Sequence, residues 1–100
     1  MYGLIGSFKA VPGRRDALLA ILLENVGAMP GCFGYVVAED PKDPDGIWIS
    51  EVWDSAESHQ ASLAIPAVKD AIARAMPLIA DFGQHTRTVP RGGHGLAPSA

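Results

Sequence analysis

A predicted strand runs directly into a predicted helix in the stretch IWISEVWDSAESH, residues 47–59. Its first seven residues, 47–53, are mainly β-branched and aromatic and therefore favour a strand. Asp54 then offers a helix N-cap, with Glu57 three residues later as the second acid of a capping box. This order predicts that Trp53 ends the strand beside a helix carrying His59. Both side chains would then border one cavity between the sheet and the helix.

An aromatic ring beside an ionisable imidazole suits the wall of a pocket for a small organic ligand. The alternative is that Trp53 packs in the core and His59 lies on the surface, since an aromatic residue at a strand end usually serves packing. Periodicity alone leaves both interpretations open.

The rest of the chain alternates between strands and helices around this stretch. Strands are predicted at residues 2–10, 32–39, 47–53 and 82–89, and helical regions at 14–29 and 54–80. Pro66 suits the first turn of a new helical segment, so a break is expected near Ile65. The resulting order, β-α-β-β-α-β, predicts an α+β protein with a ferredoxin-like fold. Its helices would cover one face of an antiparallel sheet.

The predicted sheet is apolar on both faces. In strand 47–53, Ile47, Ile49 and Trp53 share one face while Trp48 and Val52 share the other. A sheet that met water on one face would alternate apolar with polar residues. Because a large apolar patch is rarely left exposed on a monomer, we expect a homodimer in which a second copy covers the face without helices.

Length and composition indicate one small globular domain. The 100 residues are 48% hydrophobic and 19% charged, a balance typical of a packed domain. The formal net charge is −3 and Lys and Arg gather on no face, which argues against a nucleic-acid partner. Residues 1–89 are predicted to form the domain. Residues 90–100, rich in Gly, Pro and Ser, are predicted to form a flexible C-terminal arm.

Three features predict a cytoplasmic protein without a membrane partner. The sequence has no apolar run long enough to span a bilayer, and its N-terminus lacks a cleavable signal pattern. The lone Cys32 cannot form an intramolecular disulfide and fits a reducing compartment. Cys32 itself is expected to be a small buried residue rather than a nucleophile.

Three segments together carry a family resemblance: PGCFGY at 30–35, DPDG at 43–46, and EVWDS at 51–55 followed by His59. In this order they resemble the antibiotic biosynthesis monooxygenase family. Its members are small dimeric α+β barrel proteins and include quinol monooxygenases, polyketide-tailoring monooxygenases and haem-degrading enzymes. The resemblance covers residues 2 to about 88 and implies the dimeric α+β barrel for this chain.

The resemblance also implies a reaction, in which O₂ oxygenates an electron-rich phenol, hydroquinone or polyketide-type aromatic without metal, flavin or other cofactor. Deprotonation makes such a substrate reducing enough to pass an electron to O₂. The reaction therefore needs a base, an anion-stabilising group and a dry cavity. Trp53 matches the family's pocket tryptophan. His59 falls where a polar pocket side chain can occur and is the candidate base, because an unperturbed imidazole titrates near pH ~6.5.

Four further side chains are candidates for binding the substrate. Glu51 shares strand parity with Trp53, although a buried carboxylate commonly pairs with a neighbouring cation. Tyr35 could line the pocket or pack in the core. Ser62 belongs to a small polar stripe that repeats at helical spacing. Arg74 could stabilise a phenolate if its helix turned it inward, or point outward into solvent.

The sequence departs from the haem-degrading branch, which carries an Asn in the first strand and a His about ten residues after the Trp. The only Asn is Asn25, in the predicted first helix, and Ser62 and Leu63 stand nine and ten residues after Trp53. Haem binding through that ligand is therefore not expected. The three His and one Cys lack metal-ligand spacing, so no metal site is expected either. His85, in the last strand, is expected to serve cross-strand packing or to lie on the surface.

Two other functions would suit the same fold. One is a non-catalytic dimer that binds a small molecule or serves a stress response. The other is an isomerase or cyclase that acts on an aromatic or polyketide ring. His59 could act as a base in either enzyme, so the sequence does not separate the two kinds of catalysis.

Overall fold

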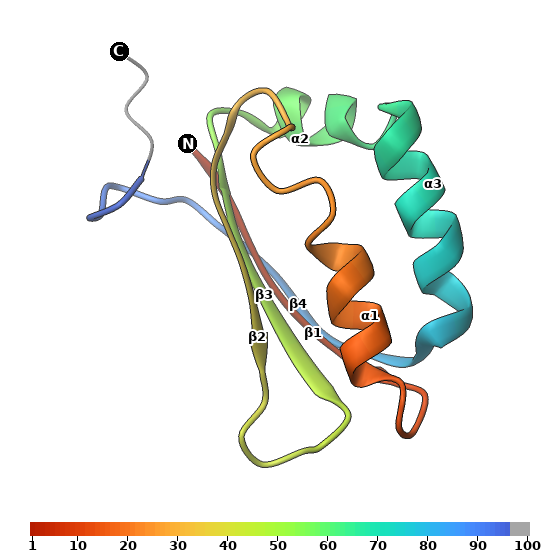
Figure 1. The fold of residues 1–100 in the computed structure, drawn as a ribbon. Coiled ribbons are helices and arrows are strands. Elements are labelled where there is room, and N and C mark those ends of the chain that lie inside the picture. The colour runs from red at the N-terminus through yellow and green to blue at the C-terminus, as the bar shows by residue number, and fades with distance from the viewer. Residues whose placement is uncertain (97–100) are drawn as a thin grey trace.

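The computed structural model describes residues 1–96, which form a four-stranded antiparallel sheet with its helices on one face (Figure 1). The elements follow one another as β1 (Tyr2–Ala10), α1 (Arg15–Leu22), β2 (Cys32–Glu39), β3 (Gly46–Trp53), α2 (Ala56–Ser62), α3 (Pro66–Ala75), a 3₁₀ turn (Met76–Leu78) and β4 (Ile79–Thr88). The strand order across the sheet is β2-β3-β1-β4. This arrangement confirms the predicted α+β, ferredoxin-like class.

The first helix is shorter than the predicted span of residues 14–29. α1 ends at Leu22, and the chain continues to β2 through turns. Val26 is 48% exposed, so an extended helix would find no core for its apolar face. Gly27 has φ +85°, a left-handed conformation that breaks a helix and that glycine adopts without strain. Leucine periodicity alone therefore predicts the helix end too late.

The second helical region consists of two helices, and its start differs from the prediction. The break expected near Ile65 is confirmed, because Ile65 is the extended N-cap of α3 and Pro66 is its first residue. The N-cap of α2 is Ser55 and not Asp54, since the Ser55 hydroxyl oxygen accepts a hydrogen bond from the Ser58 backbone N–H at 3.1 Å. The Asp54 backbone N–H donates instead to the carbonyl of Gly31 at 2.8 Å.

The contact between Asp54 and Gly31 explains why the PGCFGY segment carries a glycine at position 31. Gly31 has φ +84°, and a Cβ there would lie 2.7 Å from the side chain of Ser58 and 2.8 Å from the carboxylate of Asp54. The turn before β2 therefore sits directly on the junction between β3 and α2. Only glycine allows the backbone to approach this closely in this conformation.

The last strand begins three residues earlier than predicted and contains a bulge. β4 starts at Ile79 rather than at residue 82, so the helical region does not reach residue 80. Gly6 of β1 pairs with His85, but Phe8 pairs with Phe82, so three steps along β4 match two steps along β1. Phe82 and His85 therefore face the same side of the sheet, which strict alternation would forbid.

The core lies between the sheet and the pair α1 and α3. Leu18 of α1 is fully buried and packs with Ala10, Ile47 and Ala75. Trp53, only 1% exposed, is buried at the α2 end of the same sheet face. As predicted, Trp53 shares this face with Ile47 and Ile49.

The opposite face carries no helix in the described part of the chain, and its apolar side chains reach solvent. Ile5 is 39% and Val36 59% exposed. Segment 90–96 crosses one end of this face. A Cβ on Gly3 of β1 would lie 3.0 Å from Pro90, and one on Gly34 of β2 would lie 3.6 Å from Leu96. The predicted arm thus begins against the sheet, and its residues 97–100 lie outside the described residues. Among residues 1–96 no helix has the length and apolar character to cross a membrane.

Candidate functional site

A carboxylate at the end of β3 joins an indole and an imidazole. The Trp53 indole Nε1–H donates to Oε1 of Glu51 at 2.9 Å. The Nε2 atom of His59 lies 3.9 Å from the same oxygen. The carboxylate and the imidazole are both mostly buried, with 16% of the Glu51 side chain and 21% of the His59 side chain exposed. The structure therefore brings together three residues that the sequence analysis proposes for the site.

Local structure explains this grouping. Glu51 and Trp53 are two residues apart on one strand and so share a face. α2 begins at Ala56, and its first turn brings His59 back over the strand end. A buried indole N–H needs an acceptor, and a partly buried carboxylate needs a donor, so the bond between Trp53 and Glu51 satisfies both groups.

Two aromatic rings fix the orientation of the His59 imidazole. The Trp53 ring meets it edge to face, with 5.3 Å between centroids and a 70° interplanar angle. The Tyr2 ring lies on another side, with a centroid separation of 5.6 Å. The guanidinium of Arg87 lies 4.7 Å above the Tyr2 ring in a cation–π contact. The imidazole is thus held among packed rings, with Nε2 towards Glu51.

Glu51 lies on the wall of a cavity of about 400 Å³ on the helix-covered side of the sheet. The lining residues come from β1, β3 and β4: Leu4, Gly6, Ser7, Phe8, Ile49, Glu51, Phe82, Gly83, Gln84 and His85. Neither Trp53 nor His59 belongs to this lining. The indole is buried and the imidazole packs edge to face against it beside Glu51, and that the two side chains border one cavity stays a prediction.

A second cavity of about 240 Å³ lies between the sheet and the pair α1 and α3. Phe8, Ile49 and Phe82 line both cavities, so the two spaces share a wall. Tyr35 also lines the second cavity and is the cross-strand neighbour of Glu51. Burial, followed by the nearby charge of Glu51, raises the pKa of Tyr35 to about 12. Tyr35 is therefore a hydrogen-bond donor at neutral pH and not a base.

The structure does not bring Ser62 or Arg74 to the Glu51 cavity. Ser62 is 3% exposed, and its hydroxyl donates to the backbone carbonyl of His59 at 2.6 Å. Arg74 donates from Nη1 to Glu24 at 2.8 Å and from Nε to Asp70 at 2.9 Å. The hydrogen bonds from Arg74 hold the pKa of the Glu24 carboxyl below its usual range. The helix phase thus turns Arg74 outward, the second of the two orientations considered from the sequence.

Cys32 lies beside the cluster without a nucleophile's environment. It is the cross-strand partner of Trp53 and is partly buried. Burial first, and then the charge of Glu51, raise the pKa of the Cys32 thiol. The thiol form is therefore favoured at neutral pH, and thiolate chemistry is disfavoured.

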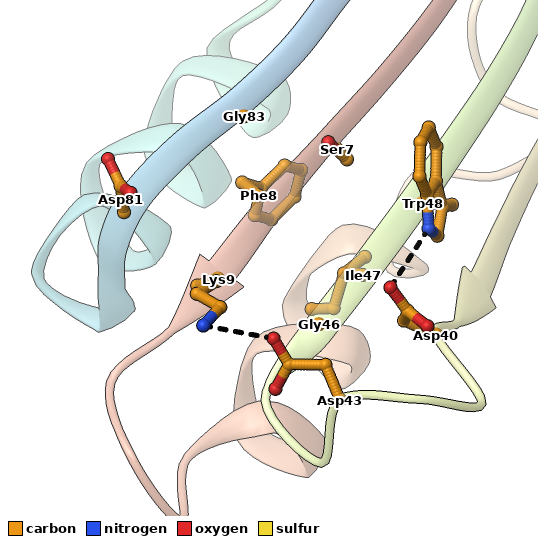
Figure 2. A pocket seen from close by; sticks show the side chains of 10 residues that line it. All are labelled: Ser7, Phe8, Lys9, Asp40, Asp43, Gly46, Ile47, Trp48, Asp81 and Gly83. Atoms are coloured by element: carbon orange, nitrogen blue, oxygen red, sulfur yellow. Dashed lines mark hydrogen bonds and ion pairs between the residues drawn. The ribbon is translucent and has the colours of Figure 1, made fainter.

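A third hollow, of about 200 Å³, lies at the end of the sheet near the loop between β2 and β3 (Figure 2). Four of its polar side chains form two pairs with one another. The Lys9 ammonium lies 3.1 Å from Asp43, and the Trp48 indole N–H donates to Asp40 at 3.3 Å. The Glu51 cavity is the stronger candidate site, because within residues 1–96 no protein donor reaches the second Glu51 oxygen, Oε2.

Sequence reasoning missed two residues of the Glu51 cavity, His85 and Gly6. His85 is exposed, as one of the two expectations from the sequence has it, but the bulge between Phe82 and His85 turns it to the side of the sheet that carries the cavity. Gly6 carries no chemical signal. The only hint is a glycine within an apolar strand, a feature that often marks a close approach or a bulge.

Comparisons with known proteins place the chain in one family. The family profile described as antibiotic biosynthesis monooxygenase matches residues 1–74. A structure from Chloroflexus aurantiacus J-10-fl, named for that family, is 64% identical, with a TM-score of 0.93 over 96% of this chain and 98% of the other. A Deinococcus radiodurans structure also named for the family is 24% identical, with a TM-score of 0.77 over 98% and 100% of the two chains.

A more distant structure shares the fold alone. It is a mutant form of SnoaB from Streptomyces nogalater, described as a cofactor-independent oxygenase, and is 14% identical. Its TM-score is 0.72 over 93% of this chain and 95% of the other. The chain matches no curated protein sequence.

Proposed function

The chain belongs to the antibiotic biosynthesis monooxygenase family, and from this premise we propose that it oxidises an electron-rich phenol or hydroquinone with O₂ and without a cofactor. The observation that carries the proposal is the Glu51 carboxylate. Its Oε1 atom is held by Trp53 and lies beside His59, while Oε2 is free of protein donors among the described residues. A carboxylate on the wall of an apolar cavity is placed to take a proton from a bound phenol.

In this proposal Glu51 and His59 act together as the base. Glu51 touches the substrate and receives the phenolic proton, and His59 then takes the proton from Glu51. A neutral imidazole has one ring nitrogen that can accept a proton, so His59 can receive the proton from the Glu51 carboxyl group. The separation of 3.9 Å is longer than a hydrogen bond, and such contacts commonly tighten once substrate is bound. Trp53 keeps the carboxylate in place throughout.

The oxidation is then carried by the substrate's own electrons. The phenolate gives one electron to O₂, and the resulting superoxide and aryloxyl radical combine at a ring carbon to form a carbon–oxygen bond. Loss of water from the hydroperoxide breaks the O–O bond. For a phenol with a free para position the balance is phenol plus O₂ giving para-quinone plus water. One oxygen atom enters the ring and the other leaves as water, so no outside reductant is needed.

The apolar walls support this chemistry. Leu4, Phe8, Ile49 and Phe82 line the cavity together with Glu51. Flat aromatic rings pack favourably against such side chains, and the apolar lining limits the water that would quench radical intermediates.

Oxygen uptake tests the proposal directly. The protein is mixed in an oxygen electrode with a panel of hydroquinones and anthrones, after treatment with a chelator and removal of flavin. We expect saturable uptake of one O₂ per substrate, with one oxygen atom in the product, a hydroxyquinone from a hydroquinone or an anthraquinone from an anthrone, and the other oxygen atom released as water rather than as hydrogen peroxide. Substrate conversion without oxygen uptake would point instead to an isomerase or cyclase. Binding without conversion would point to a non-catalytic binding protein.

We further propose that the protein is a homodimer in which a second copy covers the helix-free face of the sheet. The dimer is supported by the exposure of Ile5 and Val36 on this face, since a single chain would leave their apolar surface in water. Family membership supports the same arrangement, the dimeric α+β barrel.

Light scattering is expected to give about twice the chain mass of 10.5 kDa at micromolar concentration. Replacing Val36 with aspartate places a charge in the proposed interface and is expected to shift the protein towards monomer. The exposed Ala73 on α3 provides the control, because Ala73→Asp adds the same charge on the helix side and leaves the dimer intact. A monomeric parent protein would contradict the proposal.

A further inference from the structure

We propose that His85 is a second substrate-contacting residue, which donates a hydrogen bond to a substrate oxygen across the cavity from Glu51. The inference deepens the proposed function and rests on it for the nature of the substrate, a phenol. It concerns a residue that the sequence analysis assigns to packing or to the surface.

The bulge in β4 is the first observation. It brings Phe82 and His85 to one side of the sheet, and both line the Glu51 cavity. Ser7 stabilises the bulge, because its hydroxyl oxygen accepts a hydrogen bond from the Gln84 backbone N–H at 2.9 Å. Gly83 is required beside it, since a Cβ there would lie 2.5 Å from the same oxygen. Bulges commonly turn a side chain towards a functional site, and here the side chain is an imidazole.

Gly6 opens the space between His85 and Glu51. Gly6 of β1 pairs with His85 of β4, while the next residue on the same face, Leu4, pairs with Glu51 of β3. β1 therefore separates the two polar residues, by two strand spacings or roughly 10 Å across the sheet. A Cβ on Gly6 would meet only the Gln84 carbonyl, at 3.5 Å, so the space above Gly6 is otherwise empty. An aromatic ring lying over Gly6 would reach both residues.

The proposed chemistry needs such a donor, and the two arginines that could serve are occupied. Arg74, considered from the sequence for this role, is bound to Glu24 and Asp70. Arg87 is stacked over Tyr2 and does not line the cavity. Glu51 is an acceptor and would repel a phenolate. Apart from Glu51, the polar side chains of the lining are Ser7, Gln84 and His85, and among these only His85 is ionisable.

Binding under anaerobic conditions tests the inference without requiring turnover. The probe is 1,4-dihydroxynaphthalene, a hydroquinone whose two oxygens can meet Glu51 and His85 at the same time, titrated calorimetrically into the intact protein. His85→Phe keeps a ring of similar shape but removes the donor, and is expected to weaken binding by about tenfold, the usual effect of one lost hydrogen bond. His85→Gln retains a donor and is expected to recover most of the affinity. Thr86→Ala, the adjacent exposed residue on β4, is the control and should bind like the parent protein.

A second pair of variants locates the probe. Gly6→Val fills the space above Gly6 and is expected to weaken binding of this hydroquinone by at least about tenfold, since the two methyl groups occupy the space of the ring. Ala73→Val is the control, because it places a valine on the exposed side of α3, away from the cavity and from the proposed dimer interface. Thermal unfolding of each variant checks that the fold is retained.

The outcomes separate the two proposals. Binding that depends on His85 and Gly6, in a protein that consumes no oxygen with any substrate, supports the inference and overturns the proposed monooxygenase. Oxygen uptake by the parent, with His85→Phe unchanged in both affinity for 1,4-dihydroxynaphthalene and kcat/KM, overturns the inference alone. Failure of the parent protein to bind 1,4-dihydroxynaphthalene also overturns the inference.

Discussion

Replacing Trp53 with alanine is expected to lower the free energy of unfolding by about 3–5 kcal/mol, the usual loss for a large buried aromatic side chain. The indole is only 1% exposed and lies where β3 passes into α2. Its removal leaves a cavity between the sheet and α2, and the Glu51 carboxylate loses the donor at 2.9 Å. Urea denaturation followed by circular dichroism measures the change.

One further variant separates the lost hydrogen bond from the lost packing, and a second serves as the control. Trp53→Phe keeps most of the buried ring but removes the N–H, and is expected to cost about 1–3 kcal/mol, the range for a hydrogen bond to a charged group. Leu23→Ala is the control for truncation of an exposed apolar side chain, since Leu23 is 49% exposed. It is expected to cost well under about 1 kcal/mol. If Trp53→Ala were no more destabilising than Leu23→Ala, the indole would not be the anchor that the structure indicates.

Strands were easier to predict than helix ends, for a physical reason. β1 and β2 have the predicted bounds, and β3 begins one residue earlier, at Gly46. Alternating apolar residues bounded by Pro and Gly define a strand locally. A helix end depends on what the helix packs against. α1 stops at Leu22 because the chain beyond it has no core to cover, and its leucine-rich sequence does not reveal this.

The candidate site was predictable only where it depends on local spacing. Glu51, Trp53 and His59 meet because two residues along a strand and one helical turn set their positions. The cavity was not predictable in the same way, since its far wall comes from β4. A bulge shifts the register of β4 relative to β1, and no local sequence pattern indicates this shift. Arg74 shows the same limit, because its partner Glu24 lies 50 residues away in the chain.

The last prediction concerns the proposed base: Glu51→Gln is expected to slow oxygen uptake by roughly 10²-fold or more, the usual effect of a lost general base. Glutamine has nearly the same shape and can still accept the hydrogen bond from Trp53, so packing should change little. What it loses is the ability to take the phenolic proton. His59→Ala is expected to cause a similar loss. The neighbouring exposed acid Glu57 provides the control, and Glu57→Gln should retain the parent rate.

The double variant decides whether Glu51 and His59 work as one base. Two groups in a single proton relay are strongly non-additive, because removing either one already disables the other. The double variant is therefore expected to be about as slow as the slower single variant, instead of showing the product of the two losses. A multiplicative loss would mean that the two residues act independently, and His59 would then need its own contact with substrate. Since the His59 imidazole lies beside Glu51, and the cavity lining includes Glu51 but not His59, the geometry favours the shared relay.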